Sequence, residues 1–272
     1  MPSHPADHPK HFETDSMNIP SRWDTWQFAF LTLWSRPETA LPVLEWLATA
    51  EIPPNSVLYW LDNSGGSMAE KLRAEWQQRL RHRFRKVVWV ECGEPFRSKS
   101  GETIKDPRRH VHVARLYNLI FPRVMEEAVV VLEDDMVPPL EGVRLLLDRM
   151  QDSDRVGLVA GVYRDRVNPG KICAALDKSR WVNAPDYDAL PKEPFEIGMT
   201  GGGFTLLLNR ALQQVLPVHC KAFAEGHTLG WDGKLCVDLT ALGYRLLAHP
   251  GVMCAHLCPE IAAYDAGLRK DA

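Results

Sequence analysis

The sequence has no uninterrupted apolar run close to the roughly 20 residues that a helix needs to cross a bilayer. Its longest apolar runs, such as residues 128–132, have the length of a strand. Residues 1–22 also lack a basic region followed by an apolar one, which is the pattern of a secretory signal. We therefore predict a cytoplasmic protein, with peripheral attachment to a membrane left open.

The sequence also lacks closely spaced C-x-x-C cysteine pairs and the glycine motifs that bind phosphate groups. The 272 residues contain six cysteines and no C-x-x-C pair, which argues against a disulfide framework and a structural zinc site. The glycine triplet at 201–203 lacks the G-x-G-x-x-G spacing and is not followed by Lys and Ser or Thr, so neither a dinucleotide site nor a P-loop is indicated. The net charge of −3 argues against binding of nucleic acid or anionic membrane over the whole surface.

What the sequence does contain, from about residue 26 onward, is short apolar runs that alternate with longer amphipathic stretches. This alternation predicts an α/β fold with a mostly parallel central sheet flanked by helices. Strands are expected at 27–33, 56–61, 87–91, 128–132, 156–162, 199–208, 244–248 and 252–257. Helices are expected at 38–50, 68–81, 111–125, 140–150, 209–215 and 231–242. Residues 1–22 are predicted to be a flexible tail, 23–260 a single domain and 261–272 a C-terminal tail.

Three acidic residues directly after the apolar run at 128–132 form the strongest chemical signal. In an extended chain Glu133 and Asp135 point to one side and Asp134 to the other, so Glu133 and Asp135 can present oxygens toward one point. Hard oxygen ligands suit Mg²⁺ or Mn²⁺, and a site with one or two protein carboxylates leaves room for substrate phosphates. The ends of parallel strands are also where open α/β sheets bind ligands.

The segment VVVLEDDMVPP at 129–139 resembles the D-x-D segment of GT-A glycosyltransferases, in which a hydrophobic strand ends in two acids separated by one residue. Other segments of the chain resemble motifs of glycosyltransferase family 2, and they occur along the chain in the same order as in that family. They are Leu61-Asp62-Asn63-Ser64, the helix around Arg115, Thr200-Gly201-Gly202-Gly203-Phe204, Gly230-Trp231-Asp232 and His256. The resemblance covers roughly residues 26–256, and it implies a single GT-A domain with a small acceptor-side region at its C-terminal end.

The resemblance also implies a role for each matching residue. Asp135 and His256 would bind Mn²⁺ or Mg²⁺, and Asp232 would take the proton from the acceptor hydroxyl. The donor, a UDP-sugar or GDP-sugar, would be bound by Asp62, Asn63, Arg115, Glu133, Asp134, Gly202, Gly203 and Trp231. The implied reaction is transfer of a hexosyl group from the nucleotide to an acceptor hydroxyl with inversion at the anomeric carbon.

Two alternatives remain open at this point. Trp231 stands where the family carries an acid, which is compatible with a non-catalytic nucleotide-sugar or carbohydrate-binding module. A sugar nucleotidyltransferase is less well supported, because residues 33–37 lack the Gly-rich signature that follows the first strand in that class. The acceptor is undefined: residues 97–109 carry five basic and two acidic residues, which is compatible with a glycan, lipid-linked, nucleic-acid or small-molecule acceptor.

Overall fold

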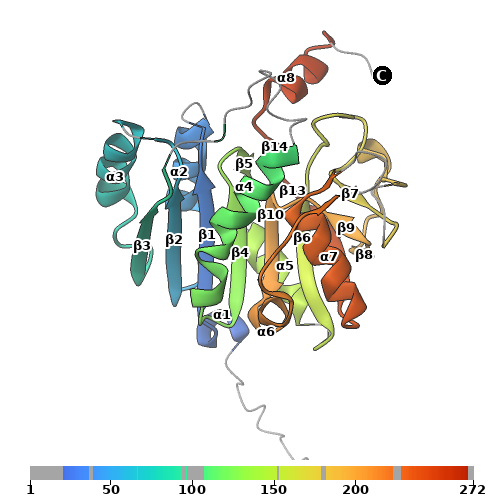
Figure 1. Ribbon diagram of the computed structural model, residues 1–272, viewed down its shortest axis with the longest axis horizontal. Helices are drawn as coiled ribbons and strands as arrows, with labels where there is room; N and C mark the ends of the chain where they lie inside the picture. Colours follow the sequence, from blue (N-terminus) through green and yellow to red (C-terminus); the bar gives the residue numbers. More distant parts are fainter. Residues whose placement is uncertain are drawn as a thin grey trace, which may run out of the picture.

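A central sheet of eight strands organises the computed structural model (Figure 1). The structure describes residues 21–36, 39–65, 67–93, 96, 107–151, 153–178, 182–222 and 228–268. Most of the tail predicted at 1–22 and most of the basic segment at 97–109 therefore lie outside the described residues.

The strands of the central sheet follow the order β3-β2-β1-β4-β10-β6-β13-β8. Their bounds are β1 Phe28–Trp34, β2 Ser56–Asp62, β3 Lys86–Glu91, β4 Ala128–Glu133, β6 Val156–Val162, β8 Phe195–Glu196, β10 Phe204–Leu208 and β13 Arg245–Met253. Strands β1, β2, β3 and β4 pair in parallel, and β13 pairs in parallel with β6. Strand β10 lies antiparallel between β4 and β6, and β8 pairs antiparallel with β13. The mostly parallel sheet predicted from the sequence is thereby confirmed.

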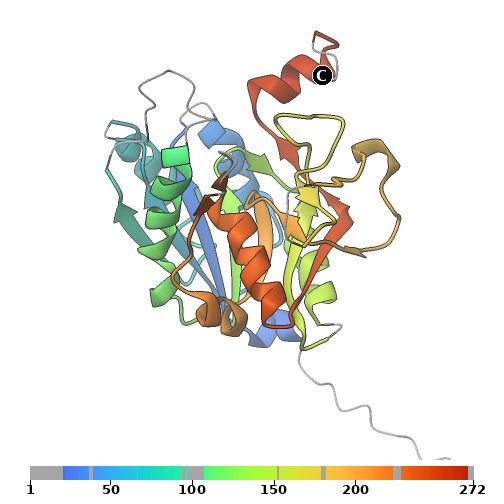
Figure 2. The same ribbon diagram turned by 45° about the vertical axis from the view of Figure 1, so that its right-hand side comes forward.

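Helices cover both faces of this sheet (Figures 1 and 2). Their bounds are α1 Arg22–Thr25, α2 Ala40–Thr49, α3 Ser67–Arg79, α4 Pro107–Asn118, α5 Gly142–Met150, α6 Asn209–Leu212, α7 Trp231–Ala241 and α8 Pro259–Asp265. Helices α4 and α7 contact each other on one face, while α2 and α5 pack on the other. The described residues also include the short 3₁₀ helices η3 Phe121–Arg123, η4 Tyr187–Ala189 and η5 Gln213–Val215. Among the described residues no helix is long and apolar enough to cross a membrane.

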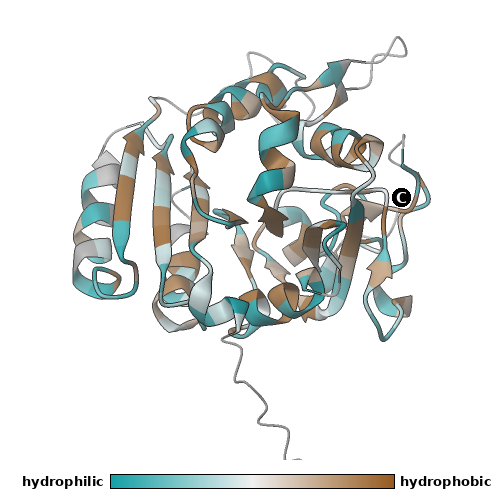
Figure 3. Ribbon diagram, turned by 90° about the horizontal axis from the view of Figure 1, so that it is seen from below, coloured by the Kyte–Doolittle hydropathy of each residue, from teal (hydrophilic) through white to brown (hydrophobic). Residues whose placement is uncertain are grey.

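The core is formed by strands that are buried on both faces. All seven residues of β1, β2 and β6 are buried, as expected for strands covered by helices on two sides. The hydropathy colouring of Figure 3 accordingly shows hydrophobic residues concentrated on the strands. Strand β3 is an edge strand and is only half-buried.

Three expected elements differ from the structure, and each difference has a local cause. The helix expected over 111–125 ends at Asn118 and gives way to η3, whose Pro122 has no N–H to continue an α-helix. The strand expected over 199–208 is divided into β9, Met199–Thr200, and β10 by the glycine triplet. The two strands expected at 244–248 and 252–257 are instead the single strand β13, whose pairing with β6 shifts register around Pro250, followed by β14, Ala255–His256.

The remaining short strands pair in twos outside the central sheet, and β5 and β14 lie above its upper edge in Figure 1. Strand β5, Met136–Val137, follows the acidic turn and pairs antiparallel with β14, so that His256 lies opposite Met136. Strand β7, Ala174–Ala175, pairs with β9, and β11, Lys221–Ala222, pairs with β12, Thr228–Leu229. Helix α8, which begins the segment predicted as a C-terminal tail, lies above this edge.

Candidate active site

A cavity of about 1050 Å³ opens where the parallel strands end, at the upper edge of the sheet. This volume is at the upper end of the range of small-molecule sites. Six predicted site residues line it, namely Asn63, Glu133, Asp134, Gly202, Trp231 and Asp232, together with the predicted metal ligand His256. The predicted residues therefore converge on one cavity, although they come from five separate segments of the chain.

The acidic turn after β4 separates its three side chains. Asp134 is buried, and its Oδ2 accepts hydrogen bonds from the backbone N–H groups of Ser35 at 2.6 Å and Arg36 at 2.7 Å. Its Oδ1 lies 2.9 Å from Arg36 Nη2. Burial raises the pKa of Asp134, while the nearby Arg36 and the two backbone N–H groups lower it. Asp134 thus fixes the loop after β1 to the end of β4.

Asp135 is completely buried and contacts three positively charged or titratable groups. Its Oδ2 contacts Arg36 Nη1, lies 2.7 Å from Arg166 Nη2 and lies 3.3 Å from His256 Nε2. Its other oxygen, Oδ1, has no hydrogen-bond partner among the described residues. A buried carboxylate oxygen without a partner is unusual, and it marks a place where a donor or a cation would be stabilised.

His256 is oriented by the backbone of the segment after β6. Its Nδ1 lies 3.0 Å from the carbonyl oxygen of Arg164, and its ring packs edge-on against Tyr163. With the hydrogen on Nδ1 donated to this carbonyl, Nε2 accepts from Arg166 Nη2 at 3.2 Å and lies 3.3 Å from Asp135 Oδ2. This arrangement of an imidazole held by a backbone carbonyl is typical of histidine metal ligands.

The donor chemistry of Asp135 and His256 fits a divalent ion such as Mn²⁺ or Mg²⁺, because such ions accept a carboxylate oxygen and an imidazole nitrogen. In the described part of the chain, no group of three or more His, Cys, Asp or Glu side chains is arranged to hold a metal. A two-residue set is sufficient only where substrate phosphates complete the coordination. The structure brings the predicted pair within 3.3 Å of each other.

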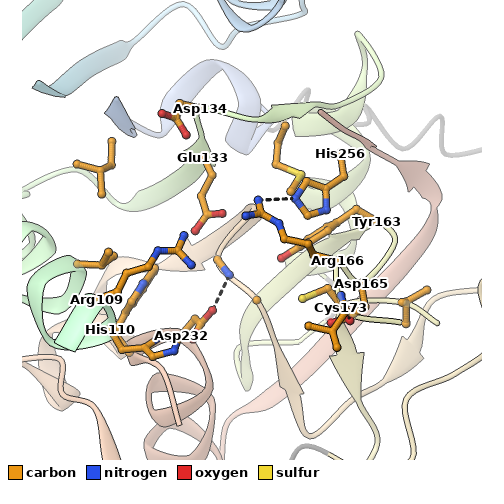
Figure 4. Close-up of a pocket in the computed structure, with 18 of the residues that line it drawn as sticks. Arg109, His110, Glu133, Asp134, Tyr163, Asp165, Arg166, Cys173, Asp232 and His256 are labelled. Atoms are coloured by element: carbon orange, nitrogen blue, oxygen red, sulfur yellow. Dashed lines mark hydrogen bonds between the residues drawn. The ribbon is translucent and has the colours of Figure 1, made fainter. Parts of the chain in front are cut away.

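Glu133 points into the middle of the cavity, with Arg109 on one side and Arg166 on the other (Figure 4). Its backbone N–H donates to the carbonyl oxygen of Gly203 at 2.8 Å, which anchors the turn to the start of β10. Arg109 is on α4, and burial lowers its pKa while the charges of Glu133 and Asp232 raise it. At the centre of the cavity a negatively charged side chain therefore lies between two positively charged ones.

The glycine triplet before β10 passes close to three side chains of the site. The N–H of Gly202 donates to Asp232 Oδ2 at 3.1 Å, and the N–H of Gly203 donates to the Tyr163 hydroxyl at 3.2 Å. A Cβ atom at Gly202 would lie 2.6 Å from Trp231 Cζ2, closer than real Cβ contacts. Glycine is required here because the backbone itself forms this wall of the cavity.

Asp232 lies in the first turn of α7, facing the cavity. Its Oδ1 accepts from the N–H of Gly233 at 2.8 Å, in addition to the bond from Gly202. Burial raises its pKa, and these two backbone bonds partly oppose the effect. A carboxylate whose pKa is raised toward neutrality in a cavity is suited to accept a proton.

Asp62 and Asn63 follow β2 at the far side of the cavity. Asp62 is buried, and its Oδ1 accepts from both the N–H and the hydroxyl of Ser64, at 3.0 and 2.6 Å, so it forms an Asx-turn. The Nδ2 of Asn63 lies 3.3 Å from His112 Nε2. Asp62 Oδ2 and Asn63 Oδ1 are buried and have no partner among the described residues. Asn63 lines the cavity beside His112 and Phe96, whereas Asp62 lies behind it.

The predicted donor residue Arg115 lies elsewhere than expected. Arg115 is exposed and does not line the cavity, because helical periodicity turns Arg109, His112 and Val113 toward it instead. We therefore correct this assignment and place Arg109 at the site in place of Arg115. Trp231 lines the cavity but is buried, with its ring 4.2 Å from that of Tyr117.

Sequence reasoning did not identify three residues that the structure places at the centre of the cavity, namely Arg36, Arg109 and Arg166. Arg36 and Arg166 follow β1 and β6, two strands whose C-terminal ends point to the same edge of the sheet. Ligands of open α/β sheets bind at these ends, but only the sheet order shows that the two arginines lie at one site.

No family model and no curated protein matches the sequence. Among solved structures, the chain is similar to the mannosyltransferase PcManGT from Pyrobaculum calidifontis, solved in complex with GDP-Man and Mn²⁺, with a TM-score of 0.56 and 14% identity. The match covers 86% of this chain and 58% of the mannosyltransferase. A197 from STIV also matches, with a TM-score of 0.47, 13% identity and coverage of 86% and 87%.

The first comparison, together with the sheet order, defines the class of the fold. The chain is an α/β protein with a Rossmann-like, mostly parallel central sheet flanked by helices, and it shares this fold with the solved structure. It spans little more than half of the mannosyltransferase chain that it matches.

Proposed function

We propose that this chain is a GT-A glycosyltransferase of the family 2 type, which transfers a sugar from a nucleotide diphosphate to an acceptor hydroxyl. The observation that supports this most directly is that His256 and Asp232 line one cavity at the strand ends, with the buried Asp135 in contact with His256. The acidic turn would meet the diphosphate, and Asp232 lies across the cavity from it. The fold shared with a mannosyltransferase is consistent with this assignment.

In the proposed mechanism the donor spans the cavity from Asn63 to Gly202. The partnerless oxygen of Asn63 accepts a hydrogen bond from the nucleobase or the ribose. Gly202 and Trp231, which pack against each other, line the cavity at the proposed sugar end. Asp135 and His256 would hold Mn²⁺ or Mg²⁺, which supplies charge stabilisation to the diphosphate leaving group.

Asp232 acts as the general base. It takes the proton of the acceptor hydroxyl while that oxygen forms a bond to the anomeric carbon and the bond from this carbon to the diphosphate breaks. A single displacement of this kind inverts the anomeric configuration. The products are the glycosylated acceptor, the nucleoside diphosphate and a proton on Asp232.

The first test is calorimetric titration of UDP and GDP into metal-free protein, with and without Mn²⁺. We expect one nucleotide to bind in a Mn²⁺-dependent manner, and we expect Asp135→Ala to abolish the dependence. Absence of binding by both nucleotides under both conditions would contradict the proposed donor site.

A second assay separates an enzyme from a non-catalytic binding module. We expect slow hydrolysis of the matching nucleotide sugar, because water can replace the acceptor in an open cavity. Binding without any hydrolysis or transfer would favour the binding module. Nuclear magnetic resonance of the released sugar before mutarotation identifies its anomer and thereby tests inversion.

A further inference from the structure

Two arginines from different loops meet on one buried carboxylate. Arg36 follows β1 and Arg166 lies in the segment after β6, and both contact Asp135 Oδ2. The carboxylate is 0% exposed, whereas the two arginine side chains are 24% and 20% exposed and line the cavity. The Asp135 carboxylate therefore lies beneath the surface of the cavity, and the guanidinium groups of Arg36 and Arg166 form part of the cavity wall.

Arg36 contacts both Asp134 and Asp135, and Arg166 shares the same oxygen of Asp135 with it. Each guanidinium carries five N–H donors in a planar fork, which matches the oxygens of a phosphate group as well as those of a carboxylate. An anion in the cavity can therefore compete with Asp135 for the same two side chains.

The position of this pair relative to the rest of the site indicates which anion it would bind. Arg166 Nη2 lies 3.2 Å from His256 Nε2, and its guanidinium faces Glu133 in the centre of the cavity (Figure 4). Both arginines line the same cavity as Asn63, at the proposed nucleobase end, and the proposed base Asp232, and a nucleotide sugar carries its diphosphate between these two ends. A simple structural role would not require both side chains to be at the cavity surface.

We propose that Arg36 and Arg166 form a clamp for the diphosphate of the donor, and that Asp135 holds the two guanidinium groups in place until the donor binds. This inference rests on the proposed function and extends it to residues outside the expected motif. Both side chains stay protonated throughout, so they donate hydrogen bonds and transfer no proton. They stabilise the negative charge that develops on the diphosphate as its bond to the anomeric carbon breaks.

The test compares ligands that carry a diphosphate with ligands that lack one. Inorganic pyrophosphate, UDP, GDP, uridine and guanosine are titrated by calorimetry into the whole chain in the presence of EDTA. For Arg36→Gln and Arg166→Gln we expect the dissociation constants of pyrophosphate and of the bound nucleoside diphosphate to rise about 10-fold each. The dissociation constant of the corresponding nucleoside should stay within about 2-fold of the wild-type value.

Arg210→Gln is the matched control, since Arg210 is an exposed arginine on α6 that pairs with Asp154. It should leave all dissociation constants unchanged. If Arg36→Gln and Arg166→Gln bind pyrophosphate and nucleoside diphosphate as tightly as the control, the clamp is wrong.

A variant of the carboxylate tests the competition. In EDTA, Asp135→Asn should leave diphosphate binding unchanged or tighten it, because the guanidinium groups no longer have a charged partner. A loss as large as that of the arginine variants would overturn the role given to Asp135. If either glutamine variant does not fold, Arg36→Lys and Arg166→Lys keep the charge but lose the fork, and a loss of about 3-fold is expected; unchanged diphosphate binding in both would overturn the clamp.

The outcomes for the clamp and for the proposed function are distinguishable. Wild-type binding of a nucleoside diphosphate that is insensitive to both arginines leaves the donor site intact and removes the clamp. Arginine-dependent binding of pyrophosphate without binding of UDP or GDP, in EDTA or with Mn²⁺, keeps the anion clamp and removes the proposed donor, and with it the diphosphate-sugar role.

Discussion

Asp134 and Ser35, 99 residues apart in the chain, are joined by two hydrogen bonds, from the Ser35 N–H at 2.6 Å and from its hydroxyl at 3.2 Å. These bonds fix the end of β4 to the loop that leaves the neighbouring strand β1. Because that loop carries Arg36, the middle acid of the turn positions a cavity-lining side chain without facing the cavity centre itself.

Asp134→Ala should lower the free energy of unfolding by roughly 3 kcal/mol, because two buried N–H groups and the Arg36 charge lose their acceptor. Urea denaturation followed by circular dichroism measures the change. Asp154→Ala is the control, since this aspartate is 80% exposed and contacts only exposed or half-buried arginines; its effect should stay below about 1 kcal/mol. Equal effects of the two variants would contradict the structural role of Asp134.

Asp232→Asn should reduce the rate of sugar transfer by about 10² to 10⁴ while the affinity for the nucleoside diphosphate stays within about 2-fold. Asp238→Asn on the same helix removes an acid that pairs with Lys234, and its kcat should be close to that of the wild type. A comparable loss in both variants would show that the effect comes from the helix and not from the base.

The pH dependence of transfer follows from the burial of Asp232. Burial raises its pKa above the ordinary 3.8, and the base must be ionised to act, so kcat should rise with pH through a midpoint above 3.8. The raised pKa of Asp232 affects the free energy of unfolding in the opposite direction, so this contribution to stability falls as the pH rises. The contribution of the protonated group is complete below pH 3.8 and is lost as the pH rises through the raised value. A kcat profile whose acidic limb lies at or below pH 3.8 would argue against Asp232 as the base.

His256→Gln should remove at least 10-fold of any Mn²⁺-dependent gain in nucleotide affinity, because the imidazole nitrogen next to Asp135 is lost. His249→Gln provides the comparison: His249 is also buried and lies on β13, away from Asp135, with its Nδ1 bonded to the N–H of Gly251. Calorimetry with and without Mn²⁺ measures both. A Mn²⁺-dependent gain that survives in His256→Gln would exclude this residue as a ligand.

Trp231→Ala should lower the free energy of unfolding by about 3–5 kcal/mol, because the indole packs against Tyr117 and, at 5.9 Å, against Phe121. Met125→Ala, at a side chain that is 85% exposed, should change it by less than about 0.5 kcal/mol. Trp231→Phe should recover most of the loss. If Trp231→Ala instead leaves stability unchanged and weakens donor binding, the indole serves mainly the ligand.

The fold and the acidic turn could be predicted because their causes are local. Five consecutive apolar residues at 128–132 fit only a strand buried on both faces, and an acid after such a strand lies at the edge of the sheet where ligands bind. Asp135 and His256 were predicted as a pair from the family resemblance, and the pairing of β5 with β14 brings them within 3.3 Å.

The arginines could not be predicted in the same way, because each is an ordinary loop residue in the sequence. Arg36 and Arg166 meet only through the sheet order, in which β10 is placed between β4 and β6 although it comes later in the chain. The motif around Arg115 predicts that this residue binds the donor. The face of a helix that lines a cavity, however, depends on how the helix packs. On α4 that face carries Arg109.

The carbonyl of Arg164 that orients His256 belongs to a residue whose guanidinium lies 3.9 Å above the ring of Tyr187 and 5.2 Å from that of Tyr264. Tyr264 is on α8, beyond the last strand. Helix α8 therefore supports the imidazole of His256 through its contact with Arg164. Shortening the chain before α8, or fusing a bulky partner there, would remove no side chain of the cavity but would loosen the support of one of its walls.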